Sequence, residues 1–191
     1  EPQAIMKLTA DELARIAELT VGHYNGRAEA FWQGTRDHDV SQNIAALLQA
    51  IEAAPPLEIL DFGCGPGRDL AAFSALGHHA TGLEGSPALA ALARQHSGCD
   101  VLEQNFIELA LPAERFHGVF ANASLQHVPA RELPRVLGEL RSTLKPRGIL
   151  FSSIPHGGDE EGWNRGRYGA YHRPATWHAY GLAAGFEEIT H

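Results

Sequence analysis

The chain has 191 residues, of which 44% are apolar and 20% are charged, proportions typical of a globular domain. Its 15 basic and 23 acidic side chains give a formal net charge of −8, which argues against binding to a nucleic-acid backbone. No apolar run approaches the length of a membrane span, and the 2 cysteines and 11 histidines lack metal-ligand spacing. We therefore expect a cytoplasmic protein with no membrane partner and no metal.

The first 54 residues predict a series of helices. Thr9 and Glu12 stand at the spacing of a capping box, so a helix is expected to begin directly after Thr9. The segment Val21–Val40 mixes aromatic, histidine and charged residues without a clear period, which indicates a short helix and loops. Ser41 can cap a further helix that runs to about Ala53 and ends before a Pro-Pro pair.

From residue 55 onward, predicted strands and helices alternate. The expected strands are Glu58–Phe62, His79–Glu84, Asp100–Glu103, Gly118–Ala121, Gly148–Ile154 and Phe186–Thr190. The expected helices are Gly67–Leu76, Pro87–His96, Arg131–Leu144 and Pro174–Ala184, the last of which ends at Gly185. This alternation predicts a doubly wound, mainly parallel α/β sheet of six strands, which binds its ligand beyond the carboxyl ends of the strands.

The loop after the first strand carries the strongest functional signal. Residues 61–67 read DFGCGPG, and Gly63 and Gly65 let the backbone turn sharply and approach a ligand closely. Glu84 closes the next strand, 23 positions after Asp61, close to the spacing at which an acid accepts hydrogen bonds from ribose hydroxyls. The alternative interpretations are a tight turn without a ligand and, for Glu84, a charge at the start of a helix.

The residue after the third glycine separates two families of nucleoside-binding proteins. Nicotinamide-dependent dehydrogenases need a glycine or alanine at position 68, where helix and strand pack closely, and Arg68 does not fit. An acid followed by Gly-x-Gly-x-Gly instead resembles the class I S-adenosylmethionine-dependent methyltransferases, over about residues 57–191. The resemblance implies a Rossmann-like methyltransferase core over residues 55–191, with S-adenosylmethionine as cofactor and S-adenosylhomocysteine as product.

In that family the acid at the head of the loop and the glycines hold the methionine part of the cofactor, and the second acid binds the ribose. The resemblance implies that the cofactor contacts Asp61, Gly63, Cys64, Gly65, Gly67, Glu84 and Gly85. It also places Asn105 and Phe106 beside the adenine, with the amide oxygen of Asn105 accepting from the adenine amino group. Asn122 and Ala123 would lie beside the methionine part. Alternatively, Phe106 is a buried residue of the hydrophobic core that contacts no ligand.

The methyl acceptor is expected to bind outside this core. Residues 1–54 resemble an amino-terminal lid over the active site, and the resemblance implies that its aromatic side chains Tyr24 and Trp32 fold over the cofactor and contact it. A long loop over residues 155–173 offers Trp163, Arg165, Arg167 and Tyr168 to hold an anionic or zwitterionic acceptor, the alternative being a solvated flap. His127 and His172 are the candidate general bases, because an imidazole titrates near neutral pH.

These features predict an S-adenosylmethionine-dependent methyltransferase that transfers a methyl group by in-line displacement to a small-molecule acceptor, as a monomer or homodimer. The acceptor atom stays open among N, O, S and C. The rival from another class is a non-catalytic sensor of the cofactor on the same fold. An aminopropyl transferase needs an acid-rich groove for its polyamine substrate. It is disfavoured because residues 159–161 are the one acidic cluster in the sequence.

The family's sheet ends in a hairpin, which we expect to be incomplete here because the chain ends within the first strand of that hairpin.

Overall fold

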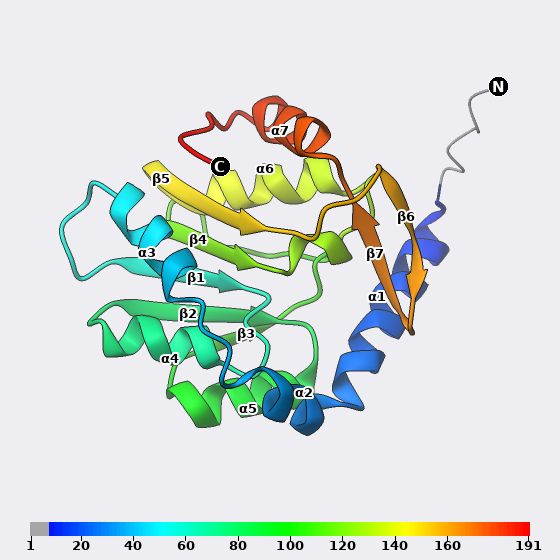
Figure 1. Ribbon diagram of the computed structural model, residues 1–191, viewed down its shortest axis with the longest axis horizontal. Coiled ribbons are helices and arrows are strands. Elements are labelled where there is room, and N and C mark those ends of the chain that lie inside the picture. Colours follow the sequence, from blue (N-terminus) through cyan, green and yellow to red (C-terminus); the bar gives the residue numbers. More distant parts are fainter. Residues whose placement is uncertain (1–7) are drawn as a thin grey trace.

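A parallel sheet of five strands forms the centre of the computed structural model, which describes residues 8–191 (Figure 1). The strands are β1 (Glu58–Phe62), β2 (His79–Glu84), β3 (Val101–Glu103), β4 (Phe116–Asn122) and β5 (Leu144–Ser153). Their order is β3-β2-β1-β4-β5, and each neighbouring pair is parallel. The predicted doubly wound α/β class is confirmed. Because the winding reverses between β1 and β4, the ligand crevice is expected at the carboxyl ends of these two strands.

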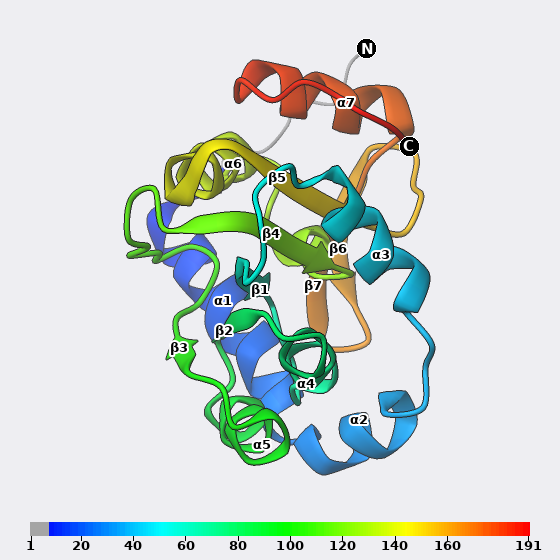
Figure 2. The ribbon, with the colours of Figure 1, turned by 90° about the vertical axis from the view of Figure 1, so that its left-hand side faces the viewer.

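Helices cover both faces of the sheet (Figure 2). One face is covered by α3 (Ser41–Ala50), α4 (Arg68–Ala75) and α5 (Pro87–Ser97), and the other by α6 (Leu133–Thr143) and α7 (Pro174–Ala183). Within β1, Ile59 packs with the residues of α3 and α4, whereas Leu60 and Phe62 pack with those of α6. Both faces of β1 are therefore buried, as expected for a central strand of a parallel sheet covered by helices on both sides.

The first two helices lie beyond the edge at which the parallel strands end (Figure 1). They are α1 (Ala10–Asn25) and α2 (Ala28–Thr35). The predicted capping box is present, since Glu12 N–H donates to Thr9 Oγ1 at 3.2 Å and Thr9 N–H donates to Glu12 Oε2 at 2.6 Å. Most of the stretch 21–40, predicted as a short helix and loops, is helical, because it contains the end of α1 and all of α2. These two helices are the part of residues 8–54 that lies over the carboxyl edge of the sheet.

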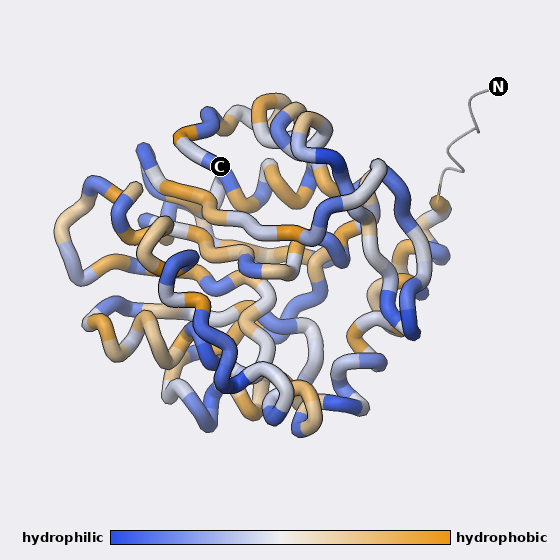
Figure 3. The backbone as a smooth tube through the Cα atoms, viewed as in Figure 1, coloured by the Kyte–Doolittle hydropathy of each residue, from blue (hydrophilic) through white to orange (hydrophobic). Residues whose placement is uncertain are grey.

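The segment 155–173, predicted as a long loop, forms a hairpin. Strands β6 (Glu160–Asn164) and β7 (Arg167–Tyr171) pair antiparallel in a sheet of their own, and β7 packs against α1. Figure 3 shows hydrophilic residues at the turn of this hairpin. The predicted loop residues are thus held at fixed positions by a ladder of backbone hydrogen bonds rather than by a flexible connection.

The prediction of a sixth strand in the main sheet, over residues 186–190, is wrong. Residues 186–190 form no strand, and the N–H of Phe186 instead bonds to the carbonyl of Gly181 at the end of α7. Gly185, with φ of +88°, makes this termination possible, as the sequence predicted. The final hairpin expected from the family resemblance is therefore not begun within the part of the chain that the structure describes.

Several boundaries differ from the predicted ones. Strand β5 begins at Leu144, directly after α6, and a short 3₁₀ helix η1 (Leu125–His127) follows β4. Helix α3 ends at Ala50, and Val40 rather than Ser41 is its N-cap. None of the helices in residues 8–191 is both long and apolar enough to cross a membrane.

Two glycines with positive φ should respond differently to alanine. At Gly67, with φ of +90°, an added Cβ would lie 2.6 Å from the Cα of Ala93, whereas at Gly77, with φ of +86°, it would meet nothing within 4 Å. We expect Gly77→Ala to cost about 1 kcal/mol of unfolding free energy through backbone strain, and Gly67→Ala to cost roughly 2 kcal/mol more because α4 and α5 must move apart. Equilibrium urea unfolding checks this, and equal losses would contradict the packing role of Gly67.

Candidate active site

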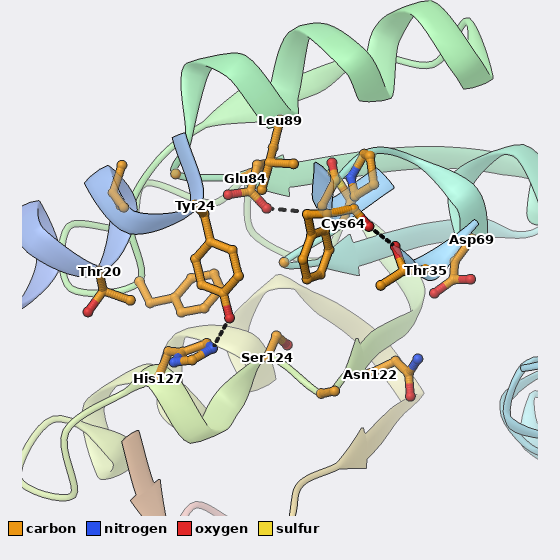
Figure 4. Close-up of a pocket in the computed structure, with 18 of the residues that line it drawn as sticks. Thr20, Tyr24, Thr35, Cys64, Asp69, Glu84, Leu89, Asn122, Ser124 and His127 are labelled. Carbon is orange, nitrogen blue, oxygen red and sulfur yellow. Dashed lines mark hydrogen bonds between the residues drawn. The ribbon is translucent and has the colours of Figure 1, made fainter. Parts of the chain in front are cut away.

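A cavity of about 290 Å³ opens at the carboxyl ends of β1 and β4, between the loops of the sheet and helices α1 and α2 (Figure 4). Most of the predicted cofactor residues line it: Tyr24, Gly63, Cys64, Gly65, Glu84, Gly85, Asn105, Phe106, Asn122 and Ala123. His127 also lines it. Residues from helix α1 and from the four loops that follow β1, β2, β3 and β4 are thus gathered around one space, at the position that the strand order predicts.

The loop after β1 forms the floor of this cavity. Gly63 and Gly65 have φ of +78° and +54°, and a Cβ on Gly63 would lie 2.5 Å from the Cβ of Ser124. The N–H groups of Gly63 and Cys64 both donate to the carbonyl of Leu83, at 2.9 and 3.0 Å. These bonds bind the loop to the end of β2, and the absence of side chains on the glycines lets a ligand reach the backbone.

Glu84 ends β2 and joins two loops through its carboxylate. Its Oε2 accepts the N–H of Gly65 at 3.0 Å, and its Oε1 accepts the N–H of Ser86 at 2.9 Å. Burial raises the pKa of this carboxyl, while the backbone donors act in the opposite direction. Each oxygen keeps a second acceptor site, so the carboxylate can still receive hydroxyl donors from the cavity.

Asp61 lies behind the loop rather than on the cavity surface. It is 2% exposed, and its Oδ2 has no hydrogen-bond partner among the described residues. Burial, reinforced by the nearby charge of Asp69, holds the pKa of the Asp61 carboxyl well above its usual range, although the Arg68 guanidinium opposes this. A buried, unpaired carboxyl destabilises a fold, so its presence in β1 indicates a role other than stability.

Phe106 and Asn105 form the part of the wall nearest β3. The ring of Phe106 stacks on buried Phe62, with 4.4 Å between ring centroids, and also lines the cavity, so both of its predicted roles are compatible with its position. Asn105 Oδ1 accepts the N–H groups of Ile107 and Glu108, both at 2.9 Å. The predicted contact of this oxygen with an adenine amino group conflicts with that turn, which already uses both of its acceptor sites.

Asn122 and Ala123 close the wall at the end of β4. Asn122 Oδ1 accepts from Asn43 Nδ2 at 3.0 Å and from Ser153 Oγ at 2.7 Å, which ties β4 to α3 and β5. Ala123 adopts φ of +54°, a left-handed conformation that costs energy in a residue with a Cβ. The turn that leads into η1 is therefore held in a strained geometry next to the cavity.

Tyr24, His127 and Arg167 form a hydrogen-bonded chain at one side of the cavity. His127 Nδ1 lies 2.7 Å from the carbonyl oxygen of Tyr168, which can only accept, so Nδ1 carries the hydrogen and Nε2 accepts from Tyr24 Oη at 2.8 Å (Figure 4). Arg167 Nη1 donates to the same phenol oxygen at 3.1 Å. Burial lowers the pKa of His127, helped by the Arg167 charge and opposed by the bond to Tyr168.

Comparison with known proteins places this arrangement in a family. Residues 59–148 match the family model described as a methyltransferase domain. Trans-aconitate 2-methyltransferase of Escherichia fergusonii is 36% identical over 114 residues, which cover 54% of this chain and 42% of that protein. Malonyl-[acyl-carrier protein] O-methyltransferase of Buchnera aphidicola is 32% identical over 137 residues, which cover 68% of this chain and 55% of that protein. The chain spans about half the length of these curated relatives.

The fold comparison agrees with this match. A crystal structure of Burkholderia thailandensis 1,6-didemethyltoxoflavin-N1-methyltransferase, with bound 1,6-didemethyltoxoflavin and S-adenosylhomocysteine, superposes with a TM-score of 0.74 at 21% identity, covering 98% of this chain and 84% of that one. Residues 59–148 therefore form a methyltransferase domain of the class I S-adenosylmethionine-dependent type. The [4+2]-cyclase SpnF has the same fold, with a TM-score of 0.71 at 20% identity over 91% of this chain and 73% of that one, so the fold alone does not define an activity.

S-adenosylmethionine is the cofactor of this family, and the cavity offers complementary groups for it. A Cβ on Gly63 would collide with the Cβ of Ser124, so glycine lets the loop pack against the turn after β4, and the bare backbone of Gly63 and Gly65 lines the cavity. The Glu84 carboxylate is held where a diol can donate to it, and Leu89 and Phe106 supply apolar wall for a flat ring. The residues present therefore fit a class I methyltransferase cofactor.

Other predicted residues lie outside the cavity. Gly67 packs on Ala93, and Trp32 stacks on His96 with 4.0 Å between ring centroids. His172 is buried between Trp177 and Tyr180, on the α7 side of the hairpin, where it cannot reach a ligand in the cavity. His172 was predicted as a general base because an imidazole titrates near neutral pH, but its position after β7 places it against α7 and away from the cavity.

The four side chains predicted to hold the methyl acceptor, those of Trp163, Arg165, Arg167 and Tyr168, do not gather around the cavity. Trp163 is 51% exposed, and Arg165 lies in the exposed turn of the hairpin. The phenol of Tyr168 is buried against Trp163, and burial together with Glu161 raises the pKa of Tyr168 to about 12. Arg167 alone of the four side chains contacts a cavity residue, Tyr24. Phe31, Thr35, Arg68 and Asp69 line the cavity but were not predicted as site residues.

Replacement of Asp61 by Asn should separate stability from binding. The pKa of Asp61 in the folded state lies above its ordinary value of 3.8, so the folded protein favours the protonated carboxyl. The free energy of unfolding therefore falls as the pH rises above the ordinary pKa, until the folded pKa is passed. We expect Asp61→Asn to stabilise the ligand-free protein at pH 8 by about 1–3 kcal/mol, to gain less at pH 5, and to weaken S-adenosylhomocysteine binding. Urea unfolding at both pH values and calorimetry check this; a variant that is less stable at pH 8 would contradict it.

Proposed function

We propose that this protein is an S-adenosylmethionine-dependent methyltransferase that acts on a small-molecule acceptor. The observation that supports it most directly is the Glu84 carboxylate, which lines the cavity while its two oxygens hold the glycine loop and the start of α5. A carboxylate fixed in this way, beside backbone without side chains, suits the ribose and the linear chain of the cofactor. We assign the ribose to Glu84 and the neighbouring chain to Gly63, Gly65 and Asn122.

Family membership supports the reaction class. The bound cofactor supplies a methyl group already activated on a sulfonium, so the protein has to position the acceptor and remove its proton where it has one. Phe106 and Leu89 offer apolar wall for the purine. No residue needs to act as a covalent nucleophile, and the roles that this chain must fill are binding, orientation and proton transfer.

We further propose that His127 is the general base and acts through Tyr24. The neutral Nε2 of His127 accepts the phenol hydrogen, so Tyr24 can take a proton from an acceptor while its own proton passes to His127. Burial and the positive charge of Arg167 disfavour the protonated form of His127 in the resting state. The base is therefore unprotonated and ready at neutral pH.

The small-molecule class rests on the shape and charge of the site. Helices α1 and α2 line one side of the cavity, as proposed for an amino-terminal lid, and the space has a volume of about 290 Å³. Two of the similar proteins are named for trans-aconitate and 1,6-didemethyltoxoflavin. Arg167 at the edge of the cavity favours an anionic or zwitterionic acceptor.

Methyl transfer can be tested without knowing the acceptor. Purified protein is incubated with S-adenosylmethionine labelled in its methyl group and a deproteinised metabolite extract, and the label is followed into small molecules. The proposal expects transfer to a small molecule, and it expects Glu84→Gln to reduce binding of S-adenosylhomocysteine by about tenfold or more, since one charged acceptor is lost. Binding without transfer favours a sensor, and no binding at all overturns the cofactor assignment.

The proton route makes a separate prediction. Because burial lowers the pKa of His127 below its ordinary value of 6.5, the turnover rate of the wild-type protein should rise with pH and reach a plateau below neutrality. Tyr24→Phe should lower that rate about 100-fold and leave S-adenosylhomocysteine affinity nearly unchanged.

Tyr180→Phe provides the matched control, because Tyr180 also contacts a histidine ring, His172, but lies outside the cavity. It should keep the wild-type rate and pH profile. A Tyr24→Phe variant with wild-type turnover would exclude the relay through the phenol, while the cofactor assignment would stand.

A further inference from the structure

An arginine–aspartate pair forms part of the cavity wall at the start of α4. Arg68 Nε donates to Asp69 Oδ1 at 2.7 Å, and Arg68 Nη2 donates to Asp69 Oδ2 at 3.1 Å, which gives a two-pronged contact. Arg68 Nη1 donates to the carbonyl of Thr35, at the end of α2, at 2.9 Å. The side chains of Arg68 and Asp69 are 22% and 11% exposed, so the pair is largely shielded but still reaches the cavity.

Arg68 keeps the capacity to bind an anion. A guanidinium has five N–H donors, and three are used in the bonds to Asp69 and Thr35, which leaves two. Among the described residues that line the cavity, Arg68 is the only arginine or lysine. Its position is fixed by Asp69 on one side and by α2 on the other, so little side-chain freedom is lost when it binds a ligand.

The cavity has two chemically different sides. Figure 4 shows Asp69 and Thr35 on one side and Thr20, Tyr24 and His127 on the other, with Glu84 and Leu89 between them. The cofactor likewise joins a flat base, a ribose diol and a zwitterionic amino acid. The diol matches Glu84 and the base matches the apolar wall, which leaves the amino-acid end for the side with the ion pair.

We propose that Arg68 binds the α-carboxylate of the cofactor's methionine part, with Asp69 as the positioning residue that holds the guanidinium toward it. This inference rests on the proposed function and extends it to a residue that the glycine motif does not include. It also gives a physical reason for an arginine at a position where the related dinucleotide-binding loops require a small residue. The bond from Arg68 to Thr35 then couples the binding of this carboxylate to the position of α2.

The test compares two ligands that differ in the amino-acid end alone. S-adenosylhomocysteine carries the α-carboxylate, and 5′-methylthioadenosine keeps the adenosyl thioether without it. Binding of each is measured by isothermal titration calorimetry to the wild-type protein, Arg68→Gln and Arg68→Lys. Arg36→Gln is the matched control, because Arg36 also pairs with the following residue, Asp37, but lies outside the cavity.

We expect Arg68→Gln to weaken S-adenosylhomocysteine about ten- to hundredfold and to change 5′-methylthioadenosine less than about threefold, since one charge-assisted contact is lost. Arg68→Lys, which keeps the charge and loses the fork, should lie between wild type and Arg68→Gln. Arg36→Gln should bind both ligands like the wild type. Cooperative thermal unfolding of each variant verifies that it folds.

The other outcomes overturn the inference in distinguishable ways. An equal loss for both ligands in Arg68→Gln would show that Arg68 acts on the fold of the cavity rather than on the carboxylate. No loss for either ligand would show that the carboxylate binds elsewhere, while the proposed function would stand. Failure of the wild-type protein to bind either ligand would overturn the proposed function and this inference together.

Discussion

The site depends on one carboxylate that receives two backbone hydrogen bonds. Glu84 accepts the N–H groups of Gly65 and Ser86, and so it links the loop after β1, the end of β2 and the start of α5. Backbone donors near a buried charge replace the water that the charge loses, which makes the arrangement tolerable in the folded protein. The same contacts fix the curvature of the glycine loop, so that the shape of the cavity and its charge have a common origin.

Other features of the same region reduce stability rather than add to it. Asp61 is buried with an unpartnered oxygen, Ala123 is held at a positive φ, and Ser124 Oγ has no partner among the described residues. All three lie at the carboxyl ends of β1 and β4, whereas the apolar clusters on both faces of the sheet are well packed. This distribution is typical of a scaffold whose core supports a locally unfavourable binding site.

Sequence patterns predicted the parts of the structure that local chemistry determines. The five parallel strands, the capping box at Thr9 and the glycine stop at Gly185 all follow from periodicity or from residue-specific backbone preferences. The hairpin over residues 160–171 was not predicted, because its glycines and charges carry no alternating apolar pattern and its register depends on packing against α1. The pairing of Tyr24 with His127, 103 positions apart, is likewise a tertiary contact that no local signal indicates. Arg68 follows the glycine loop directly, and an unexpected charge at that position was the available signal.

The most direct test of the account is a crystal structure of the protein with S-adenosylhomocysteine. We expect the ribose hydroxyls to lie within hydrogen-bond distance, about 2.6–3.2 Å, of the Glu84 carboxylate, and the linear chain of the ligand to lie over Gly63 and Gly65. Two results would contradict the claim that this carboxylate and the glycine loop form the cofactor site. One is electron density for the ligand elsewhere, and the other is a fully occupied ligand that makes no contact with Glu84.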